Sequence, residues 1–571
     1  MVALHELRAH NRVIQTMDNR IINNQSASST TLNNFPIYEE LTWIIPVVGD
    51  KGIQGRQGIQ DRQGRKNRTS PQGARVESYA SQIRGLIKSS GIYALSSLAS
   101  PLISLVLAPF LTNHLSRADY GALAILNTFI VLVAGVTQLG LNAAFFRAYG
   151  YDYESRRDRL DVISTFLVLL VLASCPAVIA IIVAAPSLAA FLLDVPTLAN
   201  TIQVAALVVL LQNLTLPGLF WLRAESRTVF FSIVSLINLL ASAAATIFFV
   251  ATMQMGIDGA ILATGVGYAI VVVCTLPTVL LRAGLRLRFD IARGMLAFGL
   301  PHTLNLIAGW VLQLLDRYLL GILGSLSQTA SYAVGYSLGS TLSAIMVTPF
   351  SMAWWVIMYS IAKRDDAAHI FQLIFRWFSL ALLFAAFGLS TFGVIVLDLF
   401  FPPGYQSAAP VIPAVALSMV FYGVNVVFTV GSSLTRKTWL LTISIGSSAL
   451  LNTVLNFVLI PSYGAMGAAT ATLIAYAALA VIAYIVNRCV YPVPFEIGLF
   501  SIALLIGIVL YLGSNLLAQS QAIYLTWAIR VAGLALYGGC LAVLGKLPDR
   551  RKTPRSTRLS RSTHLLGGFV S

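Results

Sequence analysis

Charged residues are scarce in this chain. Only 11% of its 571 residues are Asp, Glu, Lys or Arg, whereas 57% are hydrophobic. Soluble domains carry about 25% charged residues, so the composition excludes an ordinary soluble protein. The formal net charge of +16 does not indicate a nucleic-acid partner, because the basic residues lie in the two tails and in alternate short loops, as they do in membrane proteins.

Cysteine is rare as well. The four cysteines lie in apolar runs and none has C-x-x-C spacing, so neither a metal centre nor a disulfide framework is indicated. The sequence also offers no nucleophile motif and no phosphate-binding loop, and the loops predicted on the outward face are short. We therefore expect a protein that is not an enzyme and that holds no metal or cofactor.

Long apolar runs dominate what is present. A helix needs about 20 apolar residues to cross the hydrocarbon core. Runs of that length predict fourteen transmembrane helices at 91–112, 120–146, 161–186, 201–222, 229–252, 257–281, 295–321, 329–352, 372–398, 408–431, 438–460, 465–487, 497–517 and 522–545. The fold class predicted is an all-α integral membrane protein.

Basic residues orient these spans. Fifteen of the 38 lysines and arginines lie in loops after even-numbered spans, whereas Arg117 alone lies in a loop after an odd-numbered one. Because cytoplasmic loops are enriched in Lys and Arg, both termini are predicted to be cytoplasmic, and the protein is expected to span a membrane many times.

Two similar stretches predict an internal repeat. GIDGAILAT (256–264) and GAMGAATAT (464–472) open the sixth and twelfth spans. An interval of six spans keeps the orientation, so the pattern indicates two six-helix lobes related by a parallel repeat, as in some transporters. The predicted divisions are a disordered basic cytoplasmic tail at 1–88, lobes at 89–288 and 289–490, an extra helix pair at 491–546 and a basic cytoplasmic tail at 547–571.

Polar residues follow one face of the seventh span. His302, Asn305, Gly309, Gln313 and Asp316 fall within an arc of about 80°, with Arg317 beside it. Polar groups facing lipid would lack partners, so this face is expected to line a cavity. Two interpretations of Asp316 and Arg317 stay open: Asp316 carries a coupling ion, or the two side chains pair with neighbouring helices and hold the fold.

A second polar face is predicted in span 120–146. Asn127, Gln138 and Asn142 share an arc of about 80° if the helix is continuous. These residues are candidates for the substrate path, and helix packing is the alternative role.

Several stretches together resemble a known family. LTNHLSRADYGALAILNTFIVLVAGVTQLGLNAAFFRAY (111–149) is similar to the first hairpin of the bacterial polysaccharide transporters, the O-antigen and exopolysaccharide flippases of the MATE-like (MOP) superfamily. The residues that match are Arg117, Tyr120, Gly121, Gly140, Leu141 and Arg147. LPGLFWLRAESR (216–227), FGLPHTLN (298–305) with LLDRYLLG (314–321), ASYAVGYSLG (330–339) and FPPGYQSAAPVIP (401–413) add to the resemblance.

The resemblance implies a function. It suggests alternating access through a central cavity, with a polyprenyl-diphosphate-linked oligosaccharide as substrate and membrane lipids around it. A polysaccharide polymerase and glycosyltransferases are expected partners, and a proton, sodium ion or the membrane potential is the expected driving force. Phosphate needs a cation, and arginine pairs with it bidentately. Arg147 and Arg223 are the candidates at cytoplasmic helix ends. Arg317, in the periplasmic half of its span, is a candidate for late contact with the headgroup, and pairing between the lobes is its alternative role. Arg376 is expected to be an interfacial anchor and Arg530 a structural residue.

Other functions compete with this one. A multidrug or small-molecule exporter and a lipid II flippase have the same expected architecture. A membrane polymerase or ligase is disfavoured, because such enzymes need a large catalytic loop on the outward side.

Overall fold

The computed structural model describes residues 103–547 except 154, 226, 436, 438 and 519–522. The predicted N-terminal tail, 1–88, lies outside these residues, as does nearly all of the C-terminal one. Over the described part of the chain the secondary structure is helical and contains no strand. Eleven of the described helices are long and apolar enough to cross a membrane, which confirms the all-α integral membrane fold.

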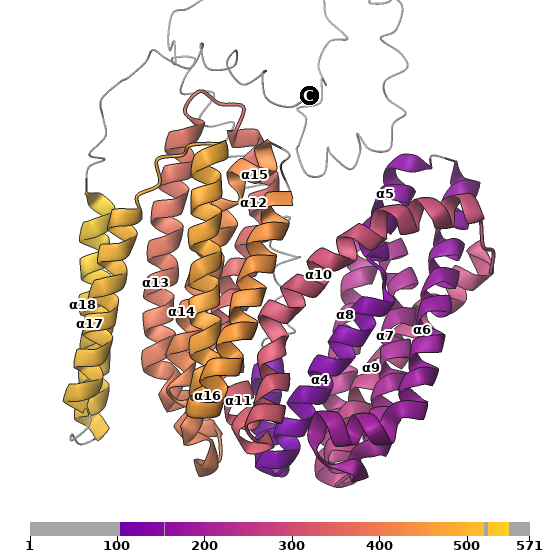
Figure 1. The fold of residues 1–571 in the computed structure, drawn as a ribbon, viewed down its shortest axis with the longest axis horizontal. Coiled ribbons are helices and arrows are strands. Elements are labelled where there is room, and N and C mark those ends of the chain that lie inside the picture. The colour runs from indigo at the N-terminus through magenta and orange to yellow at the C-terminus, as the bar shows by residue number, and fades with distance from the viewer. Residues whose placement is uncertain are drawn as a thin grey trace, which may run out of the picture. The chain divides into compact units, whose positions relative to one another are not determined.

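The helices before residue 284 form long antiparallel rods (Figure 1). After the short apolar helix Ile103–His114, their bounds are α4 (Arg117–Thr137), α5 (Leu141–Arg147), η2 (Ala148–Asp152), α6 (Arg156–Leu193), η3 (Pro196–Leu198), α7 (Ala199–Ala224), α8 (Thr228–Ile247), η4 (Phe248–Thr252) and α9 (Gly256–Ala283).

The chain from residue 289 to 546 is also built of helices over its described residues. Its elements are α10 (Phe289–Leu323), α11 (Leu326–Leu342), η5 (Ser343–Val347), α12 (Thr348–Ile361), α13 (Ala367–Phe400), η6 (Pro403–Ala408), α14 (Val411–Phe428), α15 (Val430–Leu434), α16 (Trp439–Val490), α17 (Ile497–Ala518) and α18 (Ile523–Lys546).

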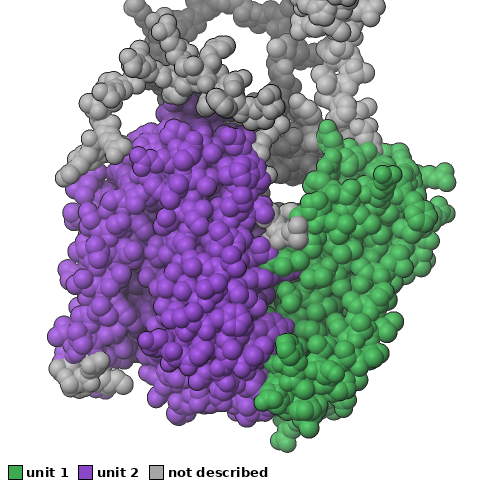
Figure 2. Space-filling view, viewed as in Figure 1, with its two compact units in different colours: residues 1–107, 126–307 green, residues 108–125, 308–571 purple. Residues whose placement is uncertain are grey.

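Two compact units divide the chain (Figure 2). Unit 1 holds residues 1–107 and 126–307, and unit 2 holds 108–125 and 308–571. These divisions differ from the boundary at 288/289 expected from the sequence, because α4 and α10 each begin in one unit and end in the other. Close backbone packing explains the assignment: a Cβ on Gly121 would lie 1.9 Å from the carbonyl oxygen of Leu326, inside unit 2.

The helix bounds differ from the predicted spans in several places. Spans 438–460 and 465–487 agree with the two parts of α16, which non-helical backbone at Gly464 separates. Span 229–252 is divided into α8 and η4, and span 408–431 into α14 and α15. Span 329–352 is divided by the π-helical turn η5. Span 120–146, predicted as one helix, is wrong: α4 ends at Thr137, and Leu139 and Gly140 have φ values of +50° and +65°. The total of fourteen spans stays a prediction.

Glycines of the repeated motif have matching backbone roles. Gly256 at the start of α9 has φ +59°, and Gly464 has φ +53°. Positive φ is readily adopted by glycine but strained for other residues. A Cβ on Gly467 would lie 2.3 Å from the carbonyl oxygen of Leu459, so the chain folds back tightly there. The repeated glycines thus allow a sharp change of direction before each helix.

A buried ion pair attaches the C-terminal helices. Arg376 of α13 donates from Nε and Nη2 to the carboxylate of Glu496, which precedes α17, and from Nη1 to the carbonyl oxygen of Leu547 at 3.0 Å, after α18. The two side chains of the pair are only 12% and 16% exposed. Arg376, which was expected to be an interfacial anchor, ties α13 to both ends of the extra helix pair; its position relative to the membrane interface stays a prediction.

Candidate functional site

The Arg-x-x-Tyr-Gly stretch docks the start of α4 inside unit 2. Arg117 donates from Nη2 to the hydroxyl of Ser331 at 2.8 Å, and its guanidinium lies 5.6 Å from the ring centroid of Tyr405. The ring of Tyr120 makes an edge contact with Tyr405 at 6.1 Å. With Gly121 against Leu326, three of the residues that carried the family resemblance form one packed contact.

A buried amide network follows α4 in unit 1. Gln138 donates to Asn213 Oδ1 at 3.0 Å, and Asn142 donates to Gln138 Oε1 at 2.8 Å. Asn213 donates in turn to Thr137 at 2.7 Å and to Ser174 at 2.8 Å. Buried amides are stabilised when their donors and acceptors are paired, so this network joins α4, α6 and α7.

The structure separates the three residues predicted on this face. Asn127 is exposed in α4, whereas Gln138 and Asn142 belong to the network after the helix break. Their common face depended on a continuous helix, and Gly140 ends that continuity. A Cβ at Gly140 would lie 2.0 Å from the carbonyl oxygen of Gly299 in α10, so the break lets α10 approach closely.

Arg147 lines a cavity in unit 1. The cavity has a volume of about 320 Å³ and is formed by residues of α5, η2 and α10. The guanidinium of Arg147 stacks on Phe298 at 4.7 Å, and its Nε is 3.5 Å from Asp152. Arg223, at the end of α7, stacks on Phe146 at 5.4 Å. Both predicted arginines therefore lie at helix ends on aromatic faces.

The polar stripe of the seventh span lies on α10, which is continuous from Phe289 to Leu323. His302 and Asn305 belong to this helix, but their side chains lie outside what the structure describes. Gln313 is exposed, whereas Asp316 is buried, at 1% exposure. Among the described residues, the stripe therefore combines an accessible amide with a fully enclosed carboxylate.

Asp316 joins three helices of unit 2. Its carboxylate accepts a hydrogen bond from the hydroxyl of Tyr332 in α11 and one from Thr472 in α16, the latter at 3.3 Å. The guanidinium of Arg317 is turned elsewhere and lies 4.6 Å from the ring centroid of Tyr336. The described residues place no Lys or Arg nitrogen within ion-pair distance of Asp316, so its hydrogen-bond partners are hydroxyl and backbone donors.

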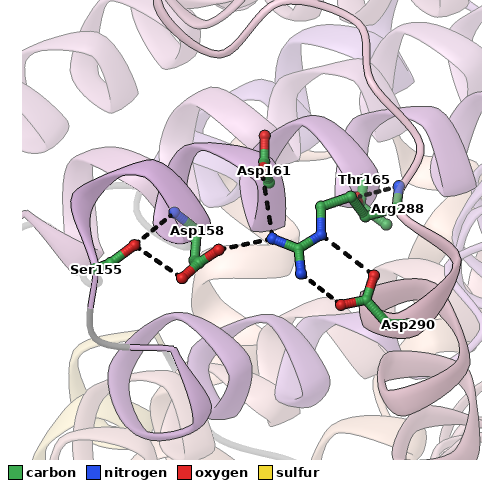
Figure 3. Close-up of polar contacts among 6 residues, drawn as sticks. All are labelled: Ser155, Asp158, Asp161, Thr165, Arg288 and Asp290. Atoms are coloured by element: carbon green, nitrogen blue, oxygen red, sulfur yellow. Dashed lines mark hydrogen bonds and ion pairs between the residues drawn. The ribbon is translucent and has the colours of Figure 1, made fainter.

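A second charged cluster lies at the end of unit 1 that includes the α9–α10 connection (Figure 3). Arg288 contacts Asp158 at 2.6 Å and Asp161 at 3.3 Å in α6, and Asp290 at 2.5 Å in α10. Hydrogen bonding to Arg288 lowers the pKa of Asp290 from its ordinary value of 3.8. Because three carboxylates surround this guanidinium, we assign the cluster to loop attachment rather than to phosphate binding.

Sequence reasoning missed several of these partners as site residues. Asn213 follows Gln212 in an otherwise apolar run, which was the only signal that it had a buried role. Tyr332 lies in a stretch that resembles the family and Thr472 in the repeated motif, yet their convergence on Asp316 depends on how α10, α11 and α16 pack. Arg117 was noted for its motif and for its loop, but not for the side chains around it.

Two solved transporter structures have a fold similar to that of this chain. The fold resembles the lipid II flippase MurJ in an inward closed conformation, with TM-score 0.60 and 15% identity over 80% of this chain and 99% of that one. It also resembles the inward-facing conformation of a multidrug resistance MATE family transporter of the MOP superfamily, with TM-score 0.51 and 16% identity over 69% and 97% of the two chains.

No curated protein matches the chain. The family model described as "Polysaccharide biosynthesis protein" matches residues 110–410, which is more than half of the sequence and includes the Arg117 contact, the amide network and Asp316. The chain therefore belongs to the polysaccharide biosynthesis protein family.

Proposed function

We propose that this protein is a flippase that moves a polyprenyl-diphosphate-linked oligosaccharide from the cytoplasmic to the periplasmic leaflet of a bacterial inner membrane by alternating access. The observation that carries the proposal is the family match over residues 110–410, in a chain with eleven apolar helices long enough to span a membrane. The fold likeness to MurJ, named as a lipid II flippase, supports a lipid-linked substrate.

The chemistry of the substrate explains why such a path needs polar groups. Each sugar hydroxyl that loses its hydrogen bonds in hydrocarbon costs a few kcal/mol, and the diphosphate adds charge. Arg147 and Arg223 supply cations at helix ends. Their aromatic neighbours, Phe298 and Phe146, hold each guanidinium plane by stacking and leave its edge for phosphate oxygens.

Asp316 is the proposed coupling group. A carboxylate enclosed in a membrane protein is costly when it is charged and has no cationic partner. Among the described residues only hydroxyl and backbone donors contact Asp316, while the charge of Arg317 acts on it from beyond ion-pair distance. A proton or a sodium ion taken up there would neutralise it, and the state of Asp316 would then bias the packing of α10, α11 and α16.

The proposed setting includes other proteins of the same process. Glycosyltransferases would supply the lipid-linked oligosaccharide on the cytoplasmic face, and a polymerase would use it on the other. The protein itself is proposed to act as a transporter and to catalyse no covalent step.

A deletion strain tests the proposal. Loss of surface polysaccharide, restored by the wild-type gene, is expected. Arg147→Gln and Arg223→Gln should restore it poorly, whereas Cys274→Ala, which changes an exposed side chain, should restore it fully. Unchanged polysaccharide together with increased drug sensitivity would instead identify a multidrug exporter, and a block in cell-wall synthesis would identify a lipid II flippase.

A further inference from the structure

A polar cavity with one cation lies within unit 2, next to the contact that Arg117 makes with Ser331. Its volume is about 590 Å³, and it is lined by the starts of α4 and α11, the end of α10, η6 and the kink of α16. Its polar side chains are Arg117, Ser327, Gln328, Ser331, Ser407, Ser462 and Tyr463. None of the lining residues is acidic.

Arg117 is held in this cavity by neutral groups. Its Nη2 donates to Ser331 at 2.8 Å and to Ser407 at 3.4 Å, and Ser407 donates to Ser331 at 2.8 Å. The Nε atom of Arg117 is buried and has no acceptor among the described residues. A buried donor left unpaired costs about 1–3 kcal/mol. No carboxylate of the described residues lies within ion-pair distance of this guanidinium to offset its positive charge.

Glycines shape the opposite wall. A Cβ on Gly464 would lie 2.9 Å from Oε1 of Gln328, and one on Gly324 would lie 2.5 Å from the same atom. The side chain of Gln328 therefore packs between the end of α10 and the kink of α16, which adds an amide to the serine hydroxyls. Such a set of donors around one guanidinium matches a phosphate group, which accepts several hydrogen bonds.

We propose that this cavity binds a phosphate group, with Arg117 as the cation and the serine hydroxyls as further donors. Arg117 is the one basic residue in the loops predicted to face outward, and the other lining segments border outward loops too. Resting on the proposed function, the site would receive the diphosphate of the carried lipid as it leaves the protein. The phosphate headgroup of a bilayer lipid has the same chemistry.

Binding of inorganic diphosphate to the purified full chain tests the site. Diphosphate is expected to raise the thermal midpoint of the wild type, and Arg117→Gln should weaken binding about ten- to hundred-fold, as expected for a lost charged hydrogen bond. Arg293→Gln removes the same charge from an exposed position in α10 and should bind as the wild type does. Equal binding by Arg117→Gln, or no binding by the wild type, would overturn the proposal.

Ser462→Trp distinguishes a loss of diphosphate binding from a loss of folded protein. Ser462 is exposed and lines the cavity, so a large side chain there should block diphosphate while Arg117 keeps its serine partners. Unimpaired binding by this variant would contradict the assignment. Micelles of a phosphate-free detergent, with and without added phosphatidylcholine or phosphatidylglycerol, identify the source: competition by either lipid assigns the site to lipid headgroups, and its absence to the carried diphosphate. Neither readout requires transport, so a failed polysaccharide phenotype would refute the proposed function alone.

Discussion

Replacement of Asp316 by asparagine separates ion coupling from a purely structural role. In the wild type, Oδ1 accepts from the backbone N–H of Arg317 at 2.8 Å, and Oδ2 accepts from two hydroxyls. An asparagine retains one oxygen and places an amide nitrogen opposite hydroxyl oxygens, which can accept as well as donate. The free energy of unfolding should therefore fall by only about 1 kcal/mol.

Replacement by leucine gives the structural reference. Tyr332 is fully buried and would keep only a 3.5 Å contact with Thr472. Thr472 retains its bond to the carbonyl oxygen of Ala468 at 2.9 Å. The cost is then mainly one unpaired buried hydroxyl, about 1–3 kcal/mol. Thermal unfolding of the two purified variants would measure this difference.

The decisive assay is transport in proteoliposomes under an imposed proton or sodium gradient. The wild-type rate should depend on one of these gradients. Asp316→Asn should fold, yet its residual transport should not respond to either gradient, because the amide binds neither ion in place of the carboxylate. Gradient-dependent transport at the wild-type rate by Asp316→Asn would refute the coupling role and leave Asp316 as a link between three helices.

Two further predictions concern the fold. Glu496→Gln should lower the free energy of unfolding by roughly 3–5 kcal/mol, because it leaves the largely buried Arg376 without its carboxylate. The double variant Arg376→Met/Glu496→Met should regain part of this stability. Thermal unfolding measures the effect, and Asp366→Asn, at an exposed ion pair, is the control. Gly140→Ala should reduce the yield of folded protein sharply, since a left-handed backbone costs a non-glycine residue about 1–2 kcal/mol and the new Cβ would meet Gly299. Gly150→Ala, with no atom within 4 Å of its Cβ, should fold normally, and equal yields of these two variants would contradict the packing argument.

The sequence alone determined that this chain folds in a lipid bilayer. Low charge and long apolar runs leave only helices as membrane-spanning elements, because every backbone N–H and C=O group in hydrocarbon must be paired within its own segment. The repeated glycines at 256 and 464 were also visible in the sequence, and so was the polar face of the span that ends near Asp316. Local periodicity suffices for these inferences, since each concerns residues close together in the chain.

The tertiary structure decided which residues contact Asp316, Gly140 and Arg117. Whether Asp316 pairs with Arg317 depends on where α11 and α16 lie, and those helices bring Tyr332 and Thr472 to the carboxylate from 16 and 156 residues away. The helix break at Gly140 allows the close approach of α10, a contact that the periodicity of the span 120–146 does not contain. Arg117 was one basic residue in a short loop until packing surrounded it with serines, because the surroundings of a charge are set by segments distant in the sequence.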